Sequence, residues 1–352
     1  MVNGPGKRPT VKDVARLAQV HFTTVSLALR DHPRIPAATR ERIRQIAEKI
    51  GYRRDPLFMA LVARRTGARQ PMVPPRMAFL SDRPNLAAFD ATAHLRYFYE
   101  GARQQAEAMG YVCDLLFVGQ QALSAAALTE HLQRTGTHGV IIAAFEPQRG
   151  PFEMDWSNYA VVKIDARFMA PTATFVSNDQ MQVVRLAYRK LRELGYRRVG
   201  MVVNRHDEEV TWGLYSEGCY VEQNSLPPDE RIPPLYFGYD IQMEHGAPQL
   251  RAWVQRHRVD AVMANLNTIR QVAETAGFAV PRQLACACLG LNAPDPQLAG
   301  VVQNHRVVGQ KAAEALALSL KIGERGVPES PSFTYVEGCW QDGASAPALS
   351  RP

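Results

Sequence analysis

Residues 10–30, TVKDVARLAQVHFTTVSLALR, are predicted to form two short helices joined by a tight turn. The first helix is expected from about Val11 to Ala18, because its apolar residues recur at spacings of three and four. Thr10 can cap this helix, and the Asp13 carboxylate can bind the unpaired amide groups of its first turn. Residues 19–21 form the predicted turn, so the stretch has the layout of a helix-turn-helix unit.

The second helix, Phe22 to Leu29, is expected to bury Val25 and Leu29. Its remaining side chains are hydroxyls and apolar groups, where a solvated helix would carry charges. A helical hairpin inside a larger α-helical fold would show the same pattern, but in a helix-turn-helix unit such a surface contacts the major groove of DNA. The residues expected to face outward or to flank the buried seam are Phe22, Thr23, Thr24, Ser26 and Leu27.

A third predicted helix and the distribution of charge favour DNA binding. Residues 36–50, PAATRERIRQIAEKI, place Pro36 in the first turn of this helix and Ile43 on its apolar face. The chain has 352 residues, which suggests two or three domains, and a net charge of +7. Residues 1–70 hold 15 Lys and Arg against 5 Asp and Glu, a balance of +10, which leaves −3 for the rest. A basic segment confined to one end is typical of phosphate binding.

The segments TVKDVARLAQV, TTVSLAL, TRERI and IGY, in this order, resemble the N-terminal domain of the LacI/GalR (lac-repressor-like) family of transcription regulators. The resemblance implies a sequence-specific DNA-binding regulator, in most cases a repressor, that binds near-palindromic double-stranded operator DNA as a homodimer. Three positions depart from the family: Gln19 replaces a usual turn glycine, His21 a usual serine, and Leu27 a common base-reading arginine. These departures leave the expected fold unchanged and alter the expected operator sequence.

By this resemblance, residues 1–55 form the DNA-binding domain and residues 56–76 the hinge helix and Pro-rich linker. Asp55 followed by Pro56 predicts the start of a helix too short to be stable alone in water. In the family such a helix folds when two subunits meet on DNA, and a leucine, here Leu61, enters the minor groove. An ordinary amphipathic linker helix is the alternative. The expected DNA-contacting residues are Thr10, His21, Phe22, Thr23, Thr24, Ser26, Leu27, Arg30, Tyr52 and Leu61.

From Met77 onward, short apolar strands alternate with helices, a pattern that predicts parallel sheets covered on both faces. The expected fold class is therefore α/β, with an all-α helix-turn-helix domain joined to two doubly wound lobes. The resemblance implies a periplasmic-binding-protein-like sensor, with chain crossings near 195, 303 and 326. The expected domain ranges are 77–342 for the effector-binding and dimerisation domain (N-lobe about 77–194 and 304–325, C-lobe about 195–303 and 326–342) and 343–352 for a flexible tail.

Ligands of open parallel sheets bind beyond the carboxyl ends of the strands, and in this chain those ends carry Asp, Asn, Glu and Arg side chains. Such residues also favour turns and helix caps, so each position has two interpretations. The resemblance implies a small-molecule effector, a carbohydrate or a derivative of one. Tyr215, Asn292 and His305 replace a common arginine, aspartate and aromatic residue, which argues against a simple transfer of a known sugar ligand. The expected effector-binding residues are Asp82, Asp179, Tyr215, Asn265, Asn292, Gln303 and His305.

The sequence shows no catalytic signature, so we expect neither an enzyme nor a cofactor or metal site. Residues 206–209, HDEE, are interpreted as a solvated polar turn. Cys286 and Cys288 would share one face of a strand, where buried packing is favoured over a metal or a disulfide. No signal peptide or membrane span is visible, and a cytoplasmic, nucleoid-associated protein is expected. The alternatives are a solute-binding protein, against which the basic N-terminus argues, and a sugar-processing enzyme on the same scaffold.

Overall fold

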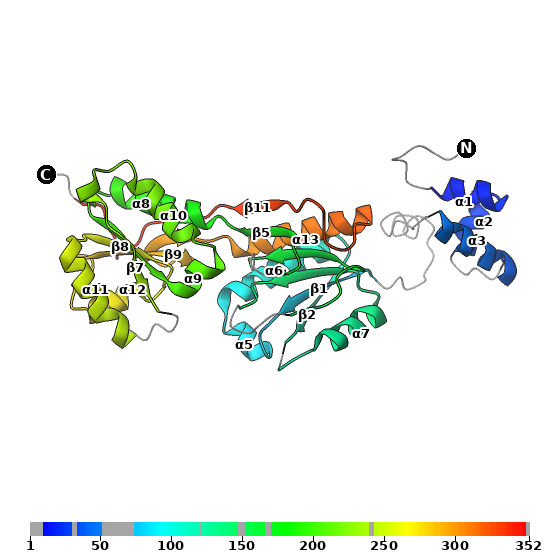
Figure 1. Ribbon diagram of the computed structural model, residues 1–352, viewed down its shortest axis with the longest axis horizontal. Coiled ribbons are helices and arrows are strands. Elements are labelled where there is room, and N and C mark those ends of the chain that lie inside the picture. Colours follow the sequence, from blue (N-terminus) through cyan, green and yellow to red (C-terminus); the bar gives the residue numbers. More distant parts are fainter. Residues whose placement is uncertain are drawn as a thin grey trace. The chain divides into compact units, whose positions relative to one another are not determined.

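The computed structural model describes residues 10–29, 34–50, 74–119, 121–146, 152–165, 170–238 and 243–349. The chain divides into two compact units, Met1–Val73 and Pro74–Pro352, and each unit is described by itself (Figure 1). The predicted hinge helix with Leu61 lies outside the described residues, as do Arg30 and Tyr52.

The first unit contains three helices, α1 (Val11–Ala18), α2 (Phe22–Ala28) and α3 (Ala37–Lys49), at the predicted places. The predicted cap of α1 is present, because the backbone N–H and the hydroxyl of Thr10 donate to Asp13 Oδ2 at 2.8 and 2.7 Å. In α2 the fully buried pair is Val25 and Ala28, whereas Leu29, expected to be buried, follows the last helical turn and is half-buried. The core shared by the three helices consists of Val14, Ala15, Ala18, Val25, Ala28, Ile43 and Ala47.

The turn between α1 and α2 depends on one left-handed residue. Gln19 has φ 53° and ψ 43°, and its N–H donates back to the last carbonyls of α1. This conformation favours glycine, the usual residue of the family at this position. The chain nevertheless reverses there, because α1 and α2 both pack against α3.

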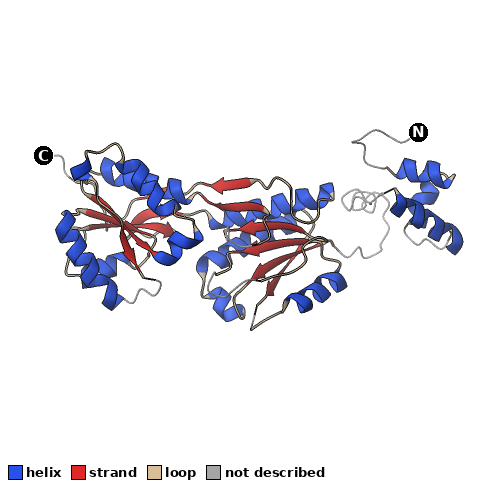
Figure 2. Ribbon diagram, viewed as in Figure 1, coloured by secondary structure: helices blue, strands red, loops and turns tan. Residues whose placement is uncertain are grey.

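The second unit is built on two six-stranded sheets, each surrounded by helices (Figure 2). All neighbouring strands are parallel except β12, which is antiparallel to β10. The first sheet has the order β11-β5-β4-β3-β1-β2 and the second the order β12-β10-β9-β8-β6-β7. The strands are β1 (Arg76–Ser81), β2 (Val112–Phe117), β3 (Gly139–Ala143), β4 (Ala160–Ile164), β5 (Thr174–Asn178), β6 (Val199–Asn204), β7 (Leu235–Phe237), β8 (Ala261–Ala264), β9 (Ala285–Leu291), β10 (Ala299–Val302), β11 (Phe333–Val336) and β12 (Cys339–Gln341).

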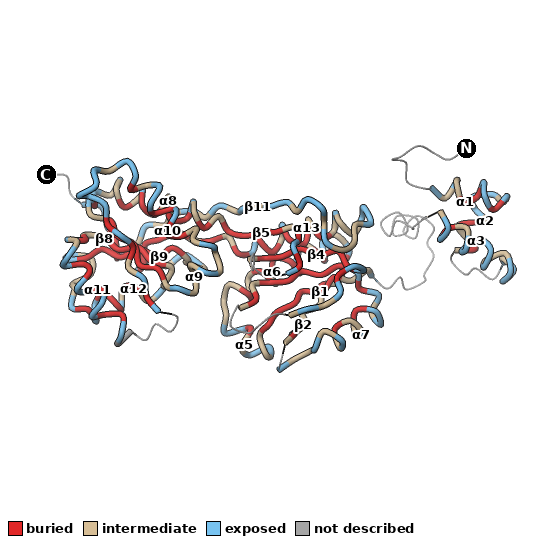
Figure 3. The backbone as a smooth tube through the Cα atoms, in the orientation of Figure 1, coloured by how far each residue is buried: buried red, intermediate tan, exposed pale blue. Residues whose placement is uncertain are grey.

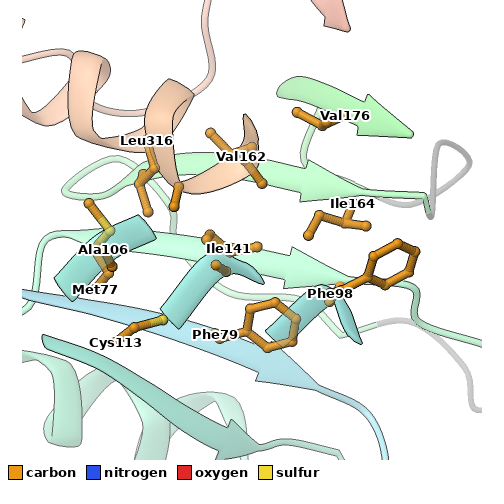
Figure 4. Packing of buried hydrophobic residues seen from close by; sticks show 14 of the residues in the cluster. Met77, Phe79, Phe98, Ala106, Cys113, Ile141, Val162, Ile164, Val176 and Leu316 are labelled. Atoms are coloured by element: carbon orange, nitrogen blue, oxygen red, sulfur yellow. The ribbon is translucent and has the colours of Figure 1, made fainter. Parts of the chain in front are cut away.

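Both faces of each sheet are buried beneath other segments, which explains why the central strands are continuous apolar runs (Figure 3). On one face of the first sheet, the side chains of Phe79, Ile141 and Val162 meet those of Phe98 and Leu316 from two helices (Figure 4). The helices of the second unit are α5 (Leu86–Asp90), α6 (Ala93–Ala108), α7 (Ala125–Thr135), α8 (Gln180–Glu193), α9 (Arg205–Val210), α10 (Leu214–Gln223), α11 (Met243–His257), α12 (Ile269–Thr275) and α13 (His305–Ile322), with a short 3-10 turn at Pro228–Glu230.

Helices α6 and α13 approach each other so closely that only glycine fits at the crossing. A Cβ on Gly309 would lie 2.0 Å from the Phe98 carbonyl oxygen, and one on Gly101 would lie 2.0 Å from the Arg306 carbonyl oxygen. The two glycines therefore let α13 pack directly against α6 over the first sheet.

Two of the three predicted chain crossings differ in the structure. Helix α8, expected in the N-lobe, packs against α10 and supplies Val183 and Leu191 to the core of the second sheet, so the first crossing follows β5 and not residue 195. Strand β11, expected in the C-lobe, pairs with β5 of the first sheet, so the last crossing lies between β11 and β12 and not near 326. A third crossing lies between β10, which ends at Val302, and α13, which begins at His305.

Residues 343–349, expected in a flexible tail, pack onto the second sheet. Ser345 is 1% exposed, and its hydroxyl donates to the Cys286 carbonyl at 2.6 Å and accepts from the Ala299 N–H at 2.9 Å. The Leu349 N–H donates to the Leu194 carbonyl at 2.8 Å. This segment therefore satisfies backbone groups of β9 and β10, a role that its run of small residues did not indicate.

Candidate functional site

The exposed surface of α2 presents an aromatic ring, an imidazole and a hydroxyl at its first turn. Phe22 is 45% exposed, and its ring centroid lies 4.3 Å from that of His21. His21 caps the helix, because its Nδ1 atom accepts from the Thr23 N–H at 3.5 Å and lies 2.9 Å from the Thr23 hydroxyl oxygen. The next outward positions, Thr24, Ser26 and Leu27, are half-buried. Hydroxyl, imidazole and apolar groups of this kind can contact base edges and thymine methyl groups.

The described part of the first unit is basic. Residues 10–29 and 34–50 hold seven Lys and Arg against three Asp and Glu. Asp13 pairs with Arg16 at 3.0 Å, and Arg42 donates to the Ala18 carbonyl at 3.3 Å, which ties α3 to the end of α1. The excess of positive charge beside α2 suits the phosphate backbone of a nucleic acid.

The second unit holds a cavity of about 190 Å³ at the carboxyl ends of strands from both sheets. In both sheets the strand order reverses beside the first strand, β1 or β6, and this is where parallel sheets bind ligands. The cavity is lined by His94, Ala144, Phe145, Glu146, Asp165, Phe175, Ser177, Gln180, His206, Asp207, Val210, Thr211, Leu214, Tyr215, Asn265, Gly290, Asn292, Gln303, His305 and Tyr335.

One ion pair joins the two lobes across this cavity. Glu146 follows β3 of the first sheet, and its Oε2 atom lies 3.0 Å from Nε2 of His206, on α9 of the second lobe. The other carboxylate oxygen of Glu146 accepts from Arg83 Nη2 at 2.5 Å, and its backbone N–H donates to Asp82 Oδ2 at 2.6 Å. Burial alone would raise the pKa of Glu146, but the hydrogen bond from His206 and the Arg83 guanidinium lower it to about 2. The hydrogen bond to Glu146 in turn raises the pKa of His206.

Asp207, on α9, is the second carboxylate that lines the cavity. Its Oδ2 atom accepts from Asn204 Nδ2 at 2.8 Å and from Asn265 Nδ2 at 2.9 Å, and its N–H donates to Asn204 Oδ1 at 2.6 Å. Burial raises the pKa of Asp207 to about 6, although these hydrogen bonds and the charge of the nearby His206 lower it. The expected solvated turn at residues 206–209 is therefore wrong: these residues form a helix capped by Asn204, and two of them line the cavity.

Asp165 lines the cavity from the first lobe, at the end of β4. Its φ of 51° is left-handed, a conformation that aspartate and asparagine tolerate better than other residues with a Cβ. Its Oδ1 atom accepts from the Ser177 hydroxyl at 2.6 Å. Burial raises the pKa of Asp165 to about 6, an effect that the Ser177 hydrogen bond only partly offsets.

Neutral polar groups complete the lining. The Tyr215 hydroxyl donates to Gln180 Oε1 at 2.7 Å, and Gln303 Nε2 donates to the same atom at 3.2 Å and to the Leu289 carbonyl at 2.9 Å. The pKa of Tyr215 is raised well above its ordinary value, by burial first and then by the charges of Asp207 and Asp165. The tyrosine therefore stays protonated and serves as a hydrogen-bonding group.

Two histidines at the edge of the cavity are held neutral. Burial lowers the pKa of His305 to about 3 and that of His94 to about 4. His305 Nδ1 lies 2.9 Å from Asn178 Nδ2, so this ring nitrogen accepts from the amide. The His305 ring also packs against Phe98, with centroids 5.1 Å apart.

Five of the seven residues expected to bind effector line the cavity: Tyr215, Asn265, Asn292, Gln303 and His305. The other two have different roles. Asp179 caps α8, where its Oδ1 atom accepts from the Gln182 N–H at 3.0 Å, and Asp82 holds the backbone of Glu146 from outside the cavity. The sequence interpretation missed His206 and Asp207. The pattern Asn204-x-x-Asp207 after an apolar strand is a helix-start signal that could have placed them on α9.

The described residues contain neither a metal-binding cluster nor a membrane-spanning helix. No group of three or more His, Cys, Asp or Glu side chains in these ranges could hold a metal ion. No helix with a described position has the length and apolar character needed to cross a membrane. Cys286 and Cys288 are fully buried in one apolar cluster on β9, which confirms that they share a face.

Comparisons with known proteins identify the first unit. Residues 10–55 match the model of the family described as "Bacterial regulatory proteins, lacI family". A relative from Streptomyces limosus, named "Uncharacterized HTH-type transcriptional regulator in aml 5'region", is 26% identical over 202 residues, which is 55% of this chain. The match spans 52% of that relative, about half of its length. The resemblance to LacI/GalR regulators is thus confirmed for the DNA-binding domain.

Solved structures share the fold over nearly the whole chain. The structure titled "transcriptional regulator CelR-cellobiose complex" is 18% identical and covers 96% of this chain and 100% of its own, with a TM-score of 0.54. A lac repressor dimer bound to operator and the anti-inducer ONPF is 16% identical and covers 97% of this chain and 100% of its own, with a TM-score of 0.55. The expected fold class, a helix-turn-helix domain with a two-lobed α/β unit, is confirmed.

Proposed function

We propose that this chain, whose residues 10–55 are a LacI-family DNA-binding domain, is a transcription regulator that a small molecule controls. The observation that carries the proposal is the combination, in one chain, of that domain with a polar cavity between two α/β lobes. Two copies of the chain bind a near-palindromic operator as a homodimer. The structures of similar fold include one with cellobiose and one with operator DNA, which supports both halves of the proposal.

The DNA-contacting residues are proposed to be those on and around α2. Thr10, His21, Phe22, Thr23, Thr24, Ser26 and Leu27 lie on or beside the exposed α2 surface, and Arg30, Tyr52 and Leu61 are proposed from the family pattern. Phosphate contacts from the basic side chains would supply affinity, and the α2 side chains would read bases.

The effector is proposed to bind in the cavity between the lobes. The effector would contact residues of both lobes, so its affinity would differ between arrangements of the lobes and it would favour one of them. The Glu146–His206 pair already joins the lobes, so a ligand at this position can strengthen or replace an existing link. In this way binding in the cavity would shift the population of chains that are competent to bind DNA.

The proposal is tested by selecting bound sequences from a random DNA pool with the full chain and with two variants. The parent should select a near-palindrome, with affinity that falls steeply as salt increases. Leu27→Arg should change the preferred base at one position of each half-site, with a discrimination of about 1–3 kcal/mol. Leu318→Arg adds the same charge at an exposed leucine of α13 and should leave the selected sequence unchanged. Failure of the parent to select any sequence would contradict the proposed function.

A further inference from the structure

The charges that line the cavity indicate a chemical class for the ligand, an inference that rests on the proposed function. Three carboxylates line the cavity, those of Glu146, Asp165 and Asp207. No lysine or arginine within the described ranges lines it, and Arg149 and Arg167 lie outside those ranges. The described lining is therefore acidic.

One of the three carboxylates is already neutralised by the protein. Glu146 accepts from Arg83 at 2.5 Å and lies 3.0 Å from the imidazole of His206. Asp165 and Asp207 differ, because the hydrogen bonds that reach them come from neutral groups. Asp165 receives the Ser177 hydroxyl at 2.6 Å, and Asp207 receives amide groups at 2.8 and 2.9 Å.

Asp165 and Asp207 act on the same region of the cavity from opposite lobes. Both charges raise the pKa of Tyr215, which lines the cavity and donates to Gln180 Oε1 at 2.7 Å. Burial also raises the pKa of each aspartate, which shows that the protein solvates their negative charges poorly. A cation placed beside them would be stabilised, and a second anion would be repelled.

The remaining lining suits hydroxyl groups. Asn265, Asn292 and Gln303 contribute amides, and the buried Asn292 Oδ1 atom has no hydrogen-bond partner among the described residues. A buried carbonyl oxygen without a partner favours a ligand that donates a hydrogen bond to it. The volume of about 190 Å³ lies below the roughly 300 Å³ at which pockets for drug-sized ligands begin, so the ligand is small.

We infer that the cavity binds a small polyhydroxylated molecule that carries an amine, with the ammonium group at Asp165 and Asp207 and hydroxyl groups at the surrounding amides. An amino sugar is a compound of this class. The corresponding neutral sugar should bind more weakly, because it brings no positive charge to either aspartate. The corresponding sugar phosphate should bind most weakly, because its charge has the same sign as theirs.

The test compares matched probes on the full chain at neutral pH: glucosamine, glucose and glucose 6-phosphate, and the same three forms of galactose. Calorimetric titration measures each affinity. We expect an amine to bind at least about tenfold more tightly than its neutral counterpart, as a charged hydrogen bond warrants. Failure of both amino sugars to bind, or tighter binding of either phosphate, would overturn the inference.

Asp165→Asn isolates the charge of one aspartate. Asparagine tolerates the left-handed backbone and can still accept from the Ser177 hydroxyl, so the shape of the site is kept. The variant should lose at least about tenfold in amine affinity and change less than about threefold for the neutral sugar. Asp179→Asn is the matched control, because it keeps the cap of α8 and lies outside the cavity lining.

An unchanged preference for the amine in Asp165→Asn would contradict the placement of the ammonium group. Should this variant fail to fold, the probe series on the parent chain still decides the ligand class. Binding of DNA from the random pool is measured in parallel. Sequence-specific DNA binding without amine binding rejects this inference alone, whereas loss of DNA selection by the parent rejects the proposed function.

Discussion

Gln19 and Asp165 are two residues with a Cβ that hold left-handed backbone conformations, each at a place that matters for function. Gln19 makes the turn of the helix-turn-helix unit, where its backbone N–H donates to the Ala15 and Arg16 carbonyls and the chain reverses. Asp165 ends β4 and directs a carboxylate into the cavity. At Gln19 the left-handed conformation raises the free energy of the folded state, whereas at Asp165 it positions a polar group.

Gln19→Gly should stabilise the first unit by about 0.5–1 kcal/mol, because glycine adopts the left-handed conformation without steric strain. Part of the gain is offset by the greater freedom of glycine in the unfolded chain. Amide hydrogen exchange of the core residues Val14 and Val25 would report the change. Gln45→Gly, in the exposed interior of α3, should instead destabilise by about 1 kcal/mol. Destabilisation by both variants would show that Gln19 is not strained.

Asp165→Asn should change how stability depends on pH. Because the folded pKa of Asp165, about 6, exceeds its unfolded value, protonated Asp165 favours folding below about pH 4. That contribution is lost as pH rises through 6, and burial of the charge then costs up to about 3 kcal/mol. The variant should therefore gain stability relative to the parent between these limits, as measured by urea unfolding. A difference that does not vary with pH would contradict the burial of this charge.

Among the helices and strands, the sequence predicted the features that depend on the local pattern of apolar residues. Strands such as β3 and β9 are continuous apolar runs because both faces of each sheet are covered, and this pattern predicted parallel sheets from Met77 onward. The lobe that α8 joins could not be predicted, since its amphipathic pattern shows that one face is buried but not against which sheet. Strand β11 has alternating exposed residues at a sheet edge, and this weak pattern gave no sign that it pairs with β5.

The residues that line the cavity could likewise be predicted only where a local sequence pattern places them. Asn265 and Asn292 could be placed because they directly follow apolar strands, whose carboxyl ends meet in a parallel sheet. His206 and Asp207 were assigned to a solvated turn, because four polar residues in a row resemble a loop. The partner of His206 is Glu146, which comes from the opposite lobe and a distant part of the sequence, and no local pattern encodes that contact.

Gly309→Ala should destabilise the second unit by about 1–3 kcal/mol, because the added methyl group would meet the backbone carbonyl of Phe98 and push α13 away from α6. Tryptophan fluorescence during urea unfolding would measure the loss. Gly238→Ala is the control, since its Cβ would meet no atom within 4 Å and its backbone is not left-handed. Equal stability of the two variants would contradict the close crossing of these helices.

The Glu146–His206 pair should make the arrangement of the lobes depend on pH. Since Glu146 raises the pKa of His206, the ion pair is complete below the ordinary histidine pKa and is lost as pH rises past the raised value. The charge of Arg83 lowers the pKa of His206, and the charge of Asp207 raises it. Glu146, whose pKa is about 2, stays ionised over this pH range. Double electron–electron resonance between labels on the two lobes should show longer distances at alkaline pH. His206→Gln should remove this pH dependence, and its persistence would show that another group holds the lobes.

The whole molecule combines a DNA-binding unit with a unit that holds a cavity. The first has the surface, the charge and the family match of a DNA-binding domain, and the second has a cavity whose lining comes from two lobes. The central claim is that a ligand in the second unit changes the DNA affinity of the first. Neither unit alone would establish this claim, because allosteric control is a coupling free energy between two sites.

The most direct test is a titration of the full chain against a fluorescent operator, taken from the sequence selection, with and without a saturating cavity ligand. Fluorescence anisotropy gives the operator affinity in each case. We expect a ligand that binds the parent to change that affinity by roughly 5- to 150-fold, the usual range of allosteric coupling. Asn292→Ala, which alters the cavity lining and not the DNA-binding domain, should require more ligand for the same change. Full occupancy of the cavity with an unchanged operator affinity would contradict the account.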